Sequence, residues 1–486
     1  MSVYHVSNFI GGMNEVVSPL LISENQAKQL IDADVQSGKI KSVKAPLKLD
    51  FDFPSDLLHY GNRNRSVVKW YDRYYWSDNV KMTYGGNIEG LGIPFPSAPP
   101  EIVKQSQIEG LTGKYKYAIT FVNKNGWESA PGLSGNYYTE VELQGQFARL
   151  GLPEKPEEIA YIKIYRTTEN GADFYCIGET KESEFFDTMD DITASMQNIL
   201  DTFEDFPPPS GGRYLTEAGG VFFLAVGSNL YFSKLSNPHA WSPLNFLGVD
   251  DTITGISPEF QGILVFTRNN AYRIVGADDA ATITKNVIPG NQGCINNRTI
   301  SQLANFPVWL SNDGICIWDG SNISIVSMRI MNTYRLSVKC AVSANDVYYL
   351  FTDDGAICFD HRNDGIFYKL STTCDYAWYD GNTDNLYLQK NDGIYLFGGG
   401  EMQNYLYVSP DIGGNDLTYK KIQEIIVSAE GPFNITVTAD NRSICSIAVK
   451  NSGRHRIKMP YSTTARTLNL KIVGSVGLNE ISVLYN

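Results

Sequence analysis

Apolar and aromatic residues gather in short runs along the middle of the chain, and the runs come in pairs separated by turn-forming residues. Three such pairs are WLSNDGICIW (309–318), VYYLFTDDGAICF (347–359) and LYLQKNDGIYLF (386–397). Asp-Gly between two such runs is a strong hairpin signal, because Gly, Asn and Asp tolerate the positive φ that a tight turn requires. The pattern therefore predicts a series of β-hairpins.

These hairpins recur at a nearly constant spacing. Two looser relatives precede them, VFFLAVGSNLYF (221–232) and ILVFTRNNAYRIV (263–275). Equivalent positions in the leading strands are Phe223, Leu264, Val308, Tyr348 and Leu386, with gaps of 41, 44, 40 and 38 residues. A hairpin every ~40 residues is typical of a β-propeller with four strands per blade. We therefore predict an all-β fold built on a β-propeller of about five to six blades. A two-sheet sandwich with regular hairpins is the alternative.

The stretch Asn-Asp-Gly-Ile occurs at 312–315, 363–366 and 391–394, and Asp-Asp-Gly-Ala occurs at 353–356. The copy at 363–366 falls between two of the hairpins above and predicts a second hairpin in its blade. The carboxylates of the four turns are those of Asp313, Asp354, Asp364 and Asp392. We interpret them as turn residues, because Asp-Gly is favoured there for backbone reasons. Paired catalytic carboxylates are the alternative.

An inserted domain interrupts the repeat. The hairpin SVVKWYDRYYWS (66–77) keeps the period if residues 97–210 are inserted between the first and second blades. Proline-rich stretches mark the edges of this insert, PFPSAPPEI at 94–102 and FPPPSGG at 206–212. Such stretches indicate boundaries because Pro cannot serve a strand interior.

Inside the insert, alternating apolar residues flank Asn-Gly turns in YKYAITFVNKNGWESAPG (115–132) and YIKIYRTTENGADFYCIGE (161–179). Short alternating strands over about a hundred residues predict an immunoglobulin or fibronectin III-like sandwich. The segment TMDDITASMQNILDTFEDF (188–206) predicts a short helix. Its apolar face would contain Ile192, Met196, Leu200 and Phe203.

The two ends of the chain differ from the repeat. A capping box of Ser23 with Gln26 predicts a short helix through Ile31, which follows an extended arm. Six alternating segments after residue 417 predict a second small β-sandwich. The predicted division is 1–45 (N-terminal arm and short helix), 46–96 (first blade segment), 97–210 (insert with short helix), 211–410 (remaining blades) and 411–486 (C-terminal β-sandwich).

Charge is unevenly distributed over these parts. The formal net charge is −13, which argues against tight binding of duplex DNA through Lys and Arg contacts to phosphate. Residues 154–205 contain 14 acids and 4 bases, whereas 417–486 contain 9 bases and 4 acids. This distribution suits assembly between copies or with partners. Ordinary solvated faces are the alternative.

Seven cysteines without a CxxC pair indicate reduced, mostly buried thiols and assembly in a reducing cytoplasm. The start MSVYHVSNF lacks the basic and apolar regions of a signal peptide. No apolar run approaches the ~20 residues of a membrane-spanning helix. We therefore expect no membrane segment.

The search for chemistry yields no catalytic, metal-ligating or cofactor-binding residues. None of the five histidines, His5, His59, His239, His361 and His455, has a His or Cys at metal-ligand spacing. SNDGICIW (311–318) is similar to the Asp-box of sialidase-like propellers, but Gly314 is one place early, and that motif is itself a structural hairpin. We therefore expect no enzyme and no cofactor, and any binding residues stay unknown.

The arm FIGGMN…SPLLISENQAKQLIDADVQSGKI, the module YKYAITFVNKNGWESAPG…YIKIYRTTENG…FFD and the propeller hairpins occur in this order. Together they resemble the tail hub or nozzle proteins of short-tailed bacteriophages (podoviruses), the tail tubular protein B and packaged-DNA stabilisation protein group. The resemblance covers nearly the whole chain and rests on architecture and loose motifs. The insert and the short C-terminal sandwich make this chain a compact version.

Membership would imply a structural virion protein without enzymatic activity. It would form a homohexameric ring below the portal and adaptor (head–tail connector) proteins, retain the packaged DNA and form the channel for its ejection. Tail fibre or tailspike proteins and plug or needle proteins would attach nearby, and genomic double-stranded DNA would pass through the channel. The expected location is the phage tail of the virion, assembled in the bacterial host cytoplasm.

Two other functions fit the predicted fold. One is a carbohydrate-binding or glycoside-hydrolysing β-propeller, which predicts carboxylates converging in a central pocket. The other is a propeller scaffold that binds host proteins through one face, which predicts a monomer with an exposed apolar patch.

Overall fold

The computed structural model describes residues 2–50, 66–77, 80–260, 262–276, 282–334, 336–362, 365–413, 418–459 and 463–486, without the side chains of 106–109. Nearly all regular structure in these residues is β. Two compact units are present: Met1–Arg63 with Leu264–Tyr272 and Val287–Asn486, and Asn64–Ile263 with Arg273–Asn286. No helix in the described part of the chain is long and apolar enough to cross a membrane.

Six antiparallel sets of four strands follow one another along the described residues. The first contains β6 (Val67–Trp70), β7 (Arg73–Trp76), β8 (Lys81–Tyr84) and β9 (Asn87–Gly90). The second contains β15 (Tyr214–Ala218), β16 (Val221–Val226), β17 (Asn229–Phe232) and β18 (Phe246–Gly248). The third contains β19 (Gly255–Glu259), β20 (Gly262–Phe266), β21 (Ala271–Val275) and β22 (Thr284–Ile288).

The other three sets have the same order. The fourth contains β23 (Ser301–Leu303), β24 (Phe306–Leu310), β25 (Ile315–Trp318) and β26 (Ile323–Ile325), preceded by the 3₁₀ helix η2 (Asn297–Thr299). The fifth contains β27 (Val338–Ala344), β28 (Val347–Thr352), β29 (Gly355–Asp360) and β30 (Ile366–Leu370). The sixth contains β31 (Tyr376–Asp380), β32 (Asn385–Lys390) and β33 (Gly393–Leu396), and the N-terminal strand β5 (Leu47–Lys48) completes it.

These sets are the blades of a β-propeller, which confirms the predicted fold class. Within the units, the first strands of successive sets contact each other: β15 lies against β6 and β19, and β27 lies against β23 and β31. The second strands of the middle four sets, β16, β20, β24 and β28, are buried on both faces. Burial on both faces explains why these strands are continuously apolar instead of alternating.

The predicted spacing follows from this order. Phe223, Leu264, Val308, Tyr348 and Leu386 all lie in the second strand of their sets, β16, β20, β24, β28 and β32. The hairpin at 66–77 differs, because it is β6–β7, the first pair of its set. The sequence-based spacing therefore aligned the first strand of this blade with the second strands of the others. The turn before Ile366 joins β29 to β30, the predicted second hairpin of its blade, while Asn363 and Asp364 lie outside the described residues.

Glycines with positive φ close three of the hairpins between second and third strands. Gly314, Gly355 and Gly393 have φ values of 147°, 137° and 144°. A Cβ at Gly355 would lie 2.2 Å from the Leu370 carbonyl oxygen, whereas a Cβ at Gly393 would meet the Cε atom of Lys48 at 3.2 Å. A backbone oxygen in a sheet cannot move aside as the end of a lysine can.

We therefore expect Gly355→Ala to lower the free energy of unfolding by about 1–3 kcal/mol from backbone strain, with a further cost from the clash. Gly393→Ala shares the strain but lacks the backbone clash, so its loss should be smaller. Urea unfolding of the two variants measures the difference. Equal losses would show that the Leu370 contact contributes nothing.

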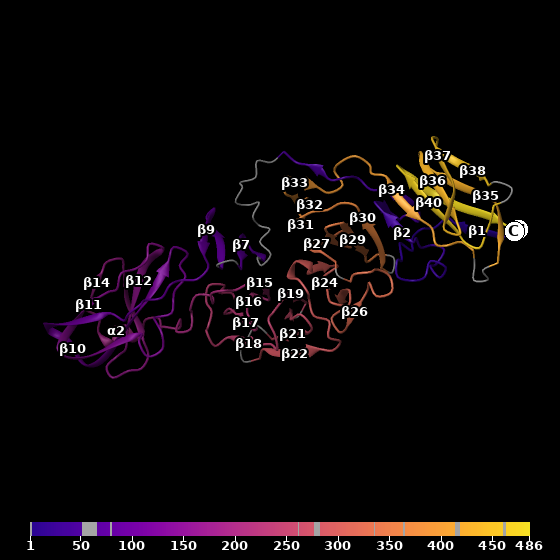
Figure 1. Ribbon diagram of the computed structural model, residues 1–486. Coiled ribbons are helices and arrows are strands. Elements are labelled where there is room, and N and C mark those ends of the chain that lie inside the picture. Colours follow the sequence, from indigo (N-terminus) through magenta and orange to yellow (C-terminus); the bar gives the residue numbers. More distant parts are fainter. Residues whose placement is uncertain are drawn as a thin grey trace. The chain divides into compact units, whose positions relative to one another are not determined.

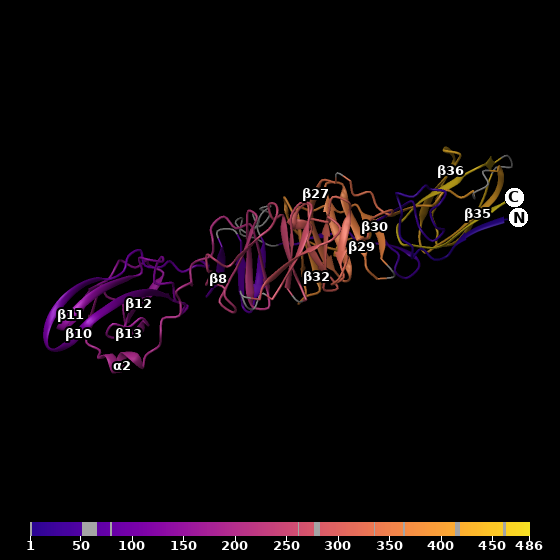
Figure 2. The ribbon, with the colours of Figure 1, turned by 90° about the horizontal axis from the view of Figure 1, so that it is seen from below.

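The insert forms one continuous five-stranded sheet in the order β13-β12-β10-β11-β14. Its strands are β10 (Glu101–Asn123), β11 (Tyr138–Gly151), β12 (Ile159–Arg166), β13 (Tyr175–Thr180) and β14 (Glu184–Asp187). The long hairpin of β10 and β11 is bent (Figure 2), and its register is irregular between Ser106 and Leu111. A Cβ at Gly178 on one edge would lie 2.7 Å from the Phe185 ring on the other. The sheet thus folds back on itself around a shared core, where the expected sandwich has two separate sheets.

The helix predicted over 188–206 is much shorter than its apolar pattern suggested. Helix α2 covers only Asp191–Ser195, with Asp190 as N-cap. Ile192 and Met196 are exposed, whereas Ala194 and Leu200 are buried. The helix ends because the following segment pairs with a strand edge, through a bridge between Tyr175 and Ile199. The four predicted positions therefore do not share one buried face.

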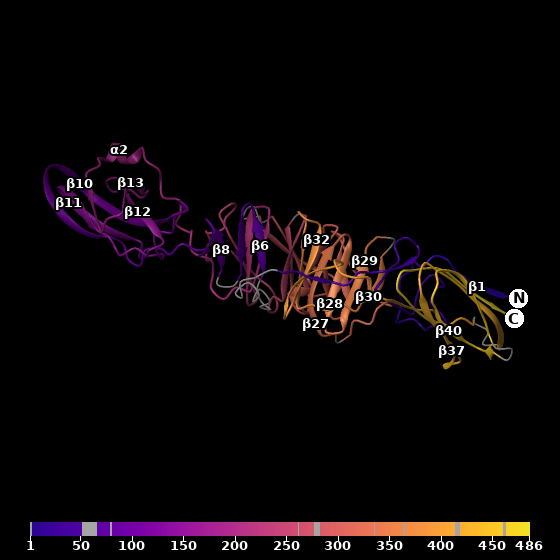
Figure 3. The same cartoon turned by 90° about the horizontal axis from the view of Figure 1, so that it is seen from above.

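The C-terminal sandwich is built around strands from both ends of the chain. One of its sheets contains β3 (Ala33–Asp34), β4 (Ile40–Ser42), β41 (Gly477–Tyr485), β35 (Lys420–Ala429), β38 (Gly453–Lys458), β1 (Ser2–Val6) and β39 (Thr464–Ala465). Strand β1 pairs with β41, so the two ends of the chain lie side by side (Figure 3).

The other sheet of the sandwich is continuous with the fifth blade. It runs β27-β28-β29-β30-β2-β34-β40-β36-β37. The joining strand β2 (Gln29–Ile31) lies between β30 and β34 (Figure 1). The remaining strands are β34 (Tyr405–Val408), β36 (Phe433–Ala439), β37 (Arg442–Val449) and β40 (Leu468–Gly474).

The helix predicted from Ser23 to Ile31 is wrong, since this stretch is a turn followed by β2. The Gln26 amide donates a hydrogen bond to the Ser23 carbonyl oxygen. This bond closes a single turn where the capping pattern predicted the start of a helix. Leu30 is 1% exposed between two strands. Strand pairing in the tertiary structure overrides the local helix signal, because the backbone groups of β2 form hydrogen bonds with two neighbouring strands, β30 and β34.

Candidate functional site

The described Asp-Gly carboxylates, those of Asp313, Asp354 and Asp392, lie in three different blades, and two of them have local partners. Asp313 accepts a hydrogen bond from Gln292 Nε2 at 2.7 Å, and Ser311 Oγ accepts from the Gly314 amide at 3.2 Å. Asp392 accepts from the Tyr395 hydroxyl and from Lys48 Nζ, which together hold the pKa of its carboxyl below its usual value. These contacts stabilise turns, as the sequence pattern predicted, and the three described carboxylates belong to turns of separate blades.

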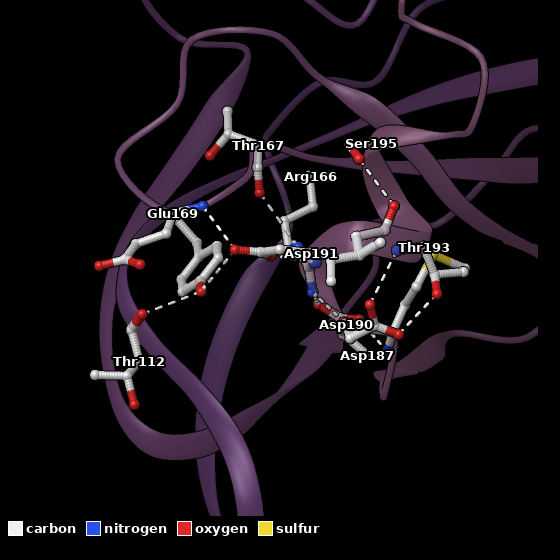
Figure 4. A network of polar contacts seen from close by, with 12 residues as sticks. Thr112, Arg166, Thr167, Glu169, Asp187, Asp190, Asp191, Thr193 and Ser195 are labelled. Carbon is white, nitrogen blue, oxygen red and sulfur yellow. Dashed lines mark hydrogen bonds and ion pairs between the residues drawn. The ribbon is translucent and has the colours of Figure 1, made fainter.

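No group of three or more His, Cys, Asp and Glu side chains in the described ranges could hold a metal ion. The most extensive polar network of the insert has a different centre, the guanidinium of Arg166 (Figure 4). Arg166 and Asp187 are both 0% exposed and their side chains form an ion pair of 2.6 Å. A second ion pair, of 2.8 Å, joins Arg166 to Asp191 in the first turn of α2.

Further hydrogen bonds surround the Arg166–Asp187 ion pair. Tyr117 donates to Asp187 at 2.7 Å, and Arg166 also donates to the Met189 carbonyl oxygen at 2.8 Å. Burial lowers the pKa of Arg166, but the Asp187 carboxylate and its other neighbours raise it more, so the net shift is upward. Burial, with Asp191 beside it, raises the pKa of Tyr115 to about 12. The network therefore ties β12, β14 and α2 together as a charged but satisfied core.

The sequence pattern predicts that Arg166 is buried, although arginine is usually exposed. In the strand YIKIYR, Ile162, Ile164 and Arg166 alternate on one face, and all three are buried. Period-two alternation places Arg166 in the core. A buried arginine requires a buried acid, and only the fold shows that Asp187 supplies it.

The network holds a segment that exposes apolar side chains to solvent. Ile192 is 71% exposed, Met196 77% and Ile199 52%. Ile192 lies in α2 and Met196, four residues later, is its C-cap, a spacing that places the two on one side of the helix. Exposed acids precede and follow them in the sequence: Glu182, Glu184, Asp190, Asp201 and Glu204. This acid-flanked apolar group, Ile192, Met196 and Ile199, is a candidate interaction surface, since three large apolar side chains within eight residues are exposed.

A second cluster joins the insert to the first two blades. The ring of Trp127 stacks on His239 with 4.4 Å between centroids and 8° between planes. The Arg73 guanidinium lies 5.2 Å from the Trp127 ring. Nearby, Lys234 pairs with Asp205 at 3.4 Å, and the Trp241 amide donates to the Phe206 carbonyl oxygen. Burial raises the pKa of Asp205.

A buried histidine, His239, belongs to this junction. It is 5% exposed, and its Nδ1 atom is buried without a hydrogen-bond partner. Burial, with Lys234 nearby, lowers the pKa of His239 to about 4, compared with about 6.5 in an unfolded chain. Between these values the unfolded state binds more protons than the folded state. Stability therefore falls as the pH drops from about 6.5 to about 4.

We expect His239 to contribute a loss of up to about 3 kcal/mol over that pH range. His239→Phe keeps a ring against Trp127 and cannot titrate, so its melting temperature should fall less than that of the wild type between pH 7 and pH 4. The exposed His361→Gln serves as control and should follow the wild type. A wild-type slope in His239→Phe would place the acid sensitivity elsewhere.

Two basic residues of the C-terminal sandwich form ion pairs within it. Arg454 and Arg456 lie on the edge strand β38. They form ion pairs with Glu480 at 3.2 Å and Glu424 at 3.7 Å on neighbouring strands. Part of the positive charge noted in the sequence is therefore neutralised inside this sandwich.

The described sheets define an all-β propeller protein with an inserted β-domain and a C-terminal β-sandwich. No family model and no curated protein matches the sequence. BamB from Moraxella catarrhalis is 11% identical with a TM-score of 0.30, over 73% of this chain and 98% of BamB. PorZ, a bacterial surface component of the type-IX secretion system of Porphyromonas gingivalis, is 8% identical with a TM-score of 0.27, over 71% of this chain and 46% of PorZ.

An exo-β-1,3-galactanase from Phanerochaete chrysosporium is 10% identical with a TM-score of 0.19, over 94% of this chain and 99% of the enzyme. At these identities and TM-scores, none of the three supports a statement about the function of this chain.

Proposed function

We propose that this chain is a structural virion protein, a ring-forming tail hub or nozzle of a short-tailed bacteriophage. In this proposal it attaches below the portal and adaptor proteins, retains the packaged DNA and forms the channel for its ejection. It acts without catalysis. The proposal rests on the resemblance of the sequence to that group, and one structural observation supports it most.

That observation is the path of the N-terminal arm through three sheets. Strand β1 pairs with β41 in the sandwich, β2 joins the sandwich to the fifth blade, and β5 completes the sixth blade. Ion pairs of Glu15 with Lys369 and of Lys48 with Asp392 add to these ladders. The sandwich and these blades therefore cannot separate unless backbone hydrogen bonds break. Such continuity suits a part that must withstand the pressure of packaged DNA.

Two further features fit a conduit. A net charge of −13 disfavours adhesion of a DNA duplex that must slide past. The acid-flanked group Ile192, Met196 and Ile199 offers a surface for a neighbouring tail protein. Retention would then come from steric closure by channel loops together with electrostatic repulsion.

The experiment is native mass spectrometry with electron microscopy of the purified protein, alone and with a portal–adaptor complex. We expect a closed ring of about six copies, formed alone or only on the adaptor. A persistent monomer that ignores the adaptor would overturn the proposal.

One observation favours a glycan-binding propeller as second candidate. Three half-buried aromatic side chains line one face of the sixth blade: Tyr376, Trp378 and Tyr387. Trp378 stacks on Tyr387 with 5.4 Å between centroids and 21° between planes. A flat aromatic platform suits the apolar face of a sugar ring. Glycan-array binding that Trp378→Ala abolishes would favour this candidate over the tail hub.

A further inference from the structure

Two cysteines from neighbouring blades meet in the core of the propeller. Cys340 lies in β27, the first strand of the fifth blade, and Cys374 lies just before β31, the first strand of the sixth. Their Sγ atoms are 3.8 Å apart, and they are 34 residues apart in sequence. Both are free thiols, 1% and 4% exposed. A disulfide needs about 2.05 Å between sulfurs, so the two sulfur atoms must approach each other by side-chain rotation to bond.

The same junction carries an ion pair beside the thiols. Lys339, next to Cys340, lies 3.8 Å from the carboxylate of Asp375, next to Cys374. The register of β27 against β28 shifts between Val338 and Cys340, so the strand is irregular at this point. Lys339 and Cys340 of the fifth blade therefore contact Asp375 and Cys374 before the sixth blade. The irregular register of β27 is a place where the backbone can adjust.

The sixth blade is also where a covalent link would matter most. Its outer strand β5 has only two residues, and it is the N-terminal segment that closes this sheet. Leu47 in that strand is 46% exposed. Short edge strands contribute few hydrogen bonds, so this blade depends on its contact with the fifth blade.

We infer that Cys340 and Cys374 form a latent disulfide site, which an oxidising medium closes into a covalent link between the fifth and sixth blades. The thiols stay reduced during synthesis in a reducing compartment. This site does not depend on the proposed tail function.

The chemistry is thiol–disulfide exchange with a small disulfide such as oxidised glutathione. The thiolate of one cysteine attacks a glutathione sulfur, which gives a mixed disulfide and releases one glutathione thiol. The second cysteine attacks the protein sulfur of that mixed disulfide, which gives the Cys340–Cys374 bond and releases the second glutathione thiol. The two thiol hydrogens of the protein end on the two glutathiones. Burial raises the pKa of the Cys374 thiol, so little thiolate exists in the closed fold and the exchange should be slow.

The test uses the full chain with Cys176→Ser and Cys445→Ser, which removes the two partly exposed thiols that would react at the surface. The folded protein is incubated with oxidised glutathione, alkylated, and digested without reductant for mass spectrometry. We expect a cross-linked Cys340–Cys374 peptide, while Cys294, Cys316 and Cys358 stay alkylatable after denaturation. Closing this loop should also raise the melting temperature by a few degrees, reversibly with dithiothreitol.

Matched variants make the result specific. Cys374→Ala should abolish both the cross-link and the rise in melting temperature. Cys358 is a fully buried thiol in β29, beside Tyr368 of β30. Cys358→Ala should therefore keep both the cross-link and the rise in melting temperature. If Cys374→Ala does not fold, the peptide map of the parent still decides. A folded parent that keeps both thiols free after long oxidation, or that cross-links only in denaturant, overturns the inference.

Discussion

Arg166→Met is expected to lower the free energy of unfolding of the insert by about 3–5 kcal/mol. The substitution leaves the Asp187 carboxylate at 0% exposure without its cation, and it also removes the ion pair to Asp191 at the start of α2. An uncompensated buried charge costs more than the pair contributes, because the desolvation of the acid remains. Urea unfolding, with hydrogen exchange measured on peptides of residues 101–187, locates the loss in the insert.

The insert itself supplies a control. Arg149 pairs with Glu184 on the same sheet, but both side chains are partly exposed, at 39% and 45%. An exposed pair contributes about 0–1 kcal/mol, so Arg149→Met should have a small effect. Arg166→Met with Asp187→Leu should recover part of the loss by removing both charges. If Arg166→Met and Arg149→Met cost the same, the buried network does not hold the insert together.

The second large effect is expected at Leu30, in the strand that joins the sandwich to the fifth blade. Leu30→Ala should lower the free energy of unfolding by about 2–5 kcal/mol through lost apolar burial and the cavity left behind. Leu30 is 1% exposed, and β2 has only three residues with which to hold β30 and β34. Amide exchange should rise in β30 and β34 together.

Leu21→Ala is the matched control in the same arm, since Leu21 is 67% exposed. Its effect should stay within about 0.5 kcal/mol. A loss at Leu30 no larger than at Leu21, or faster exchange in only one of the two strands, would contradict the view that β2 couples the blade to the sandwich.

Local signals in the sequence predicted the hairpins well because each hairpin depends on residues close together in the chain. The Asp-Gly turns at Gly314, Gly355 and Gly393 require positive φ, and apolar runs on both sides identify the strands. The repeat made the propeller predictable for the same reason. The hairpin at 66–77 was aligned with the second and third strands of the other blades, although it contains the first and second strands of its own.

One predicted helix is absent and the other is shorter than its apolar face required, because both outcomes depend on pairing with strands elsewhere. The segment from Ser23 to Ile31 has a capping pattern, yet β30 and β34 lie more than three hundred positions later and recruit it as a strand. In the segment 188–206, apolar spacing predicted a short helix with a face from Ile192 to Phe203, but α2 covers only Asp191–Ser195 and Ile199 forms a bridge with Tyr175. Neither partner is visible from the local sequence.

By itself, the sequence determined the class of fold, the period of the blades, the place of the insert and the structural role of the Asp-Gly turns. All of these follow from turn chemistry and from the alternation of residues near each other in the chain. Tertiary structure alone decided that β5 closes the sixth blade, that Arg166 meets Asp187, that Trp127 stacks on His239 and that Cys340 meets Cys374. The physical reason is that such pairs depend on which distant segments the fold brings together, and neither periodicity nor composition specifies that choice.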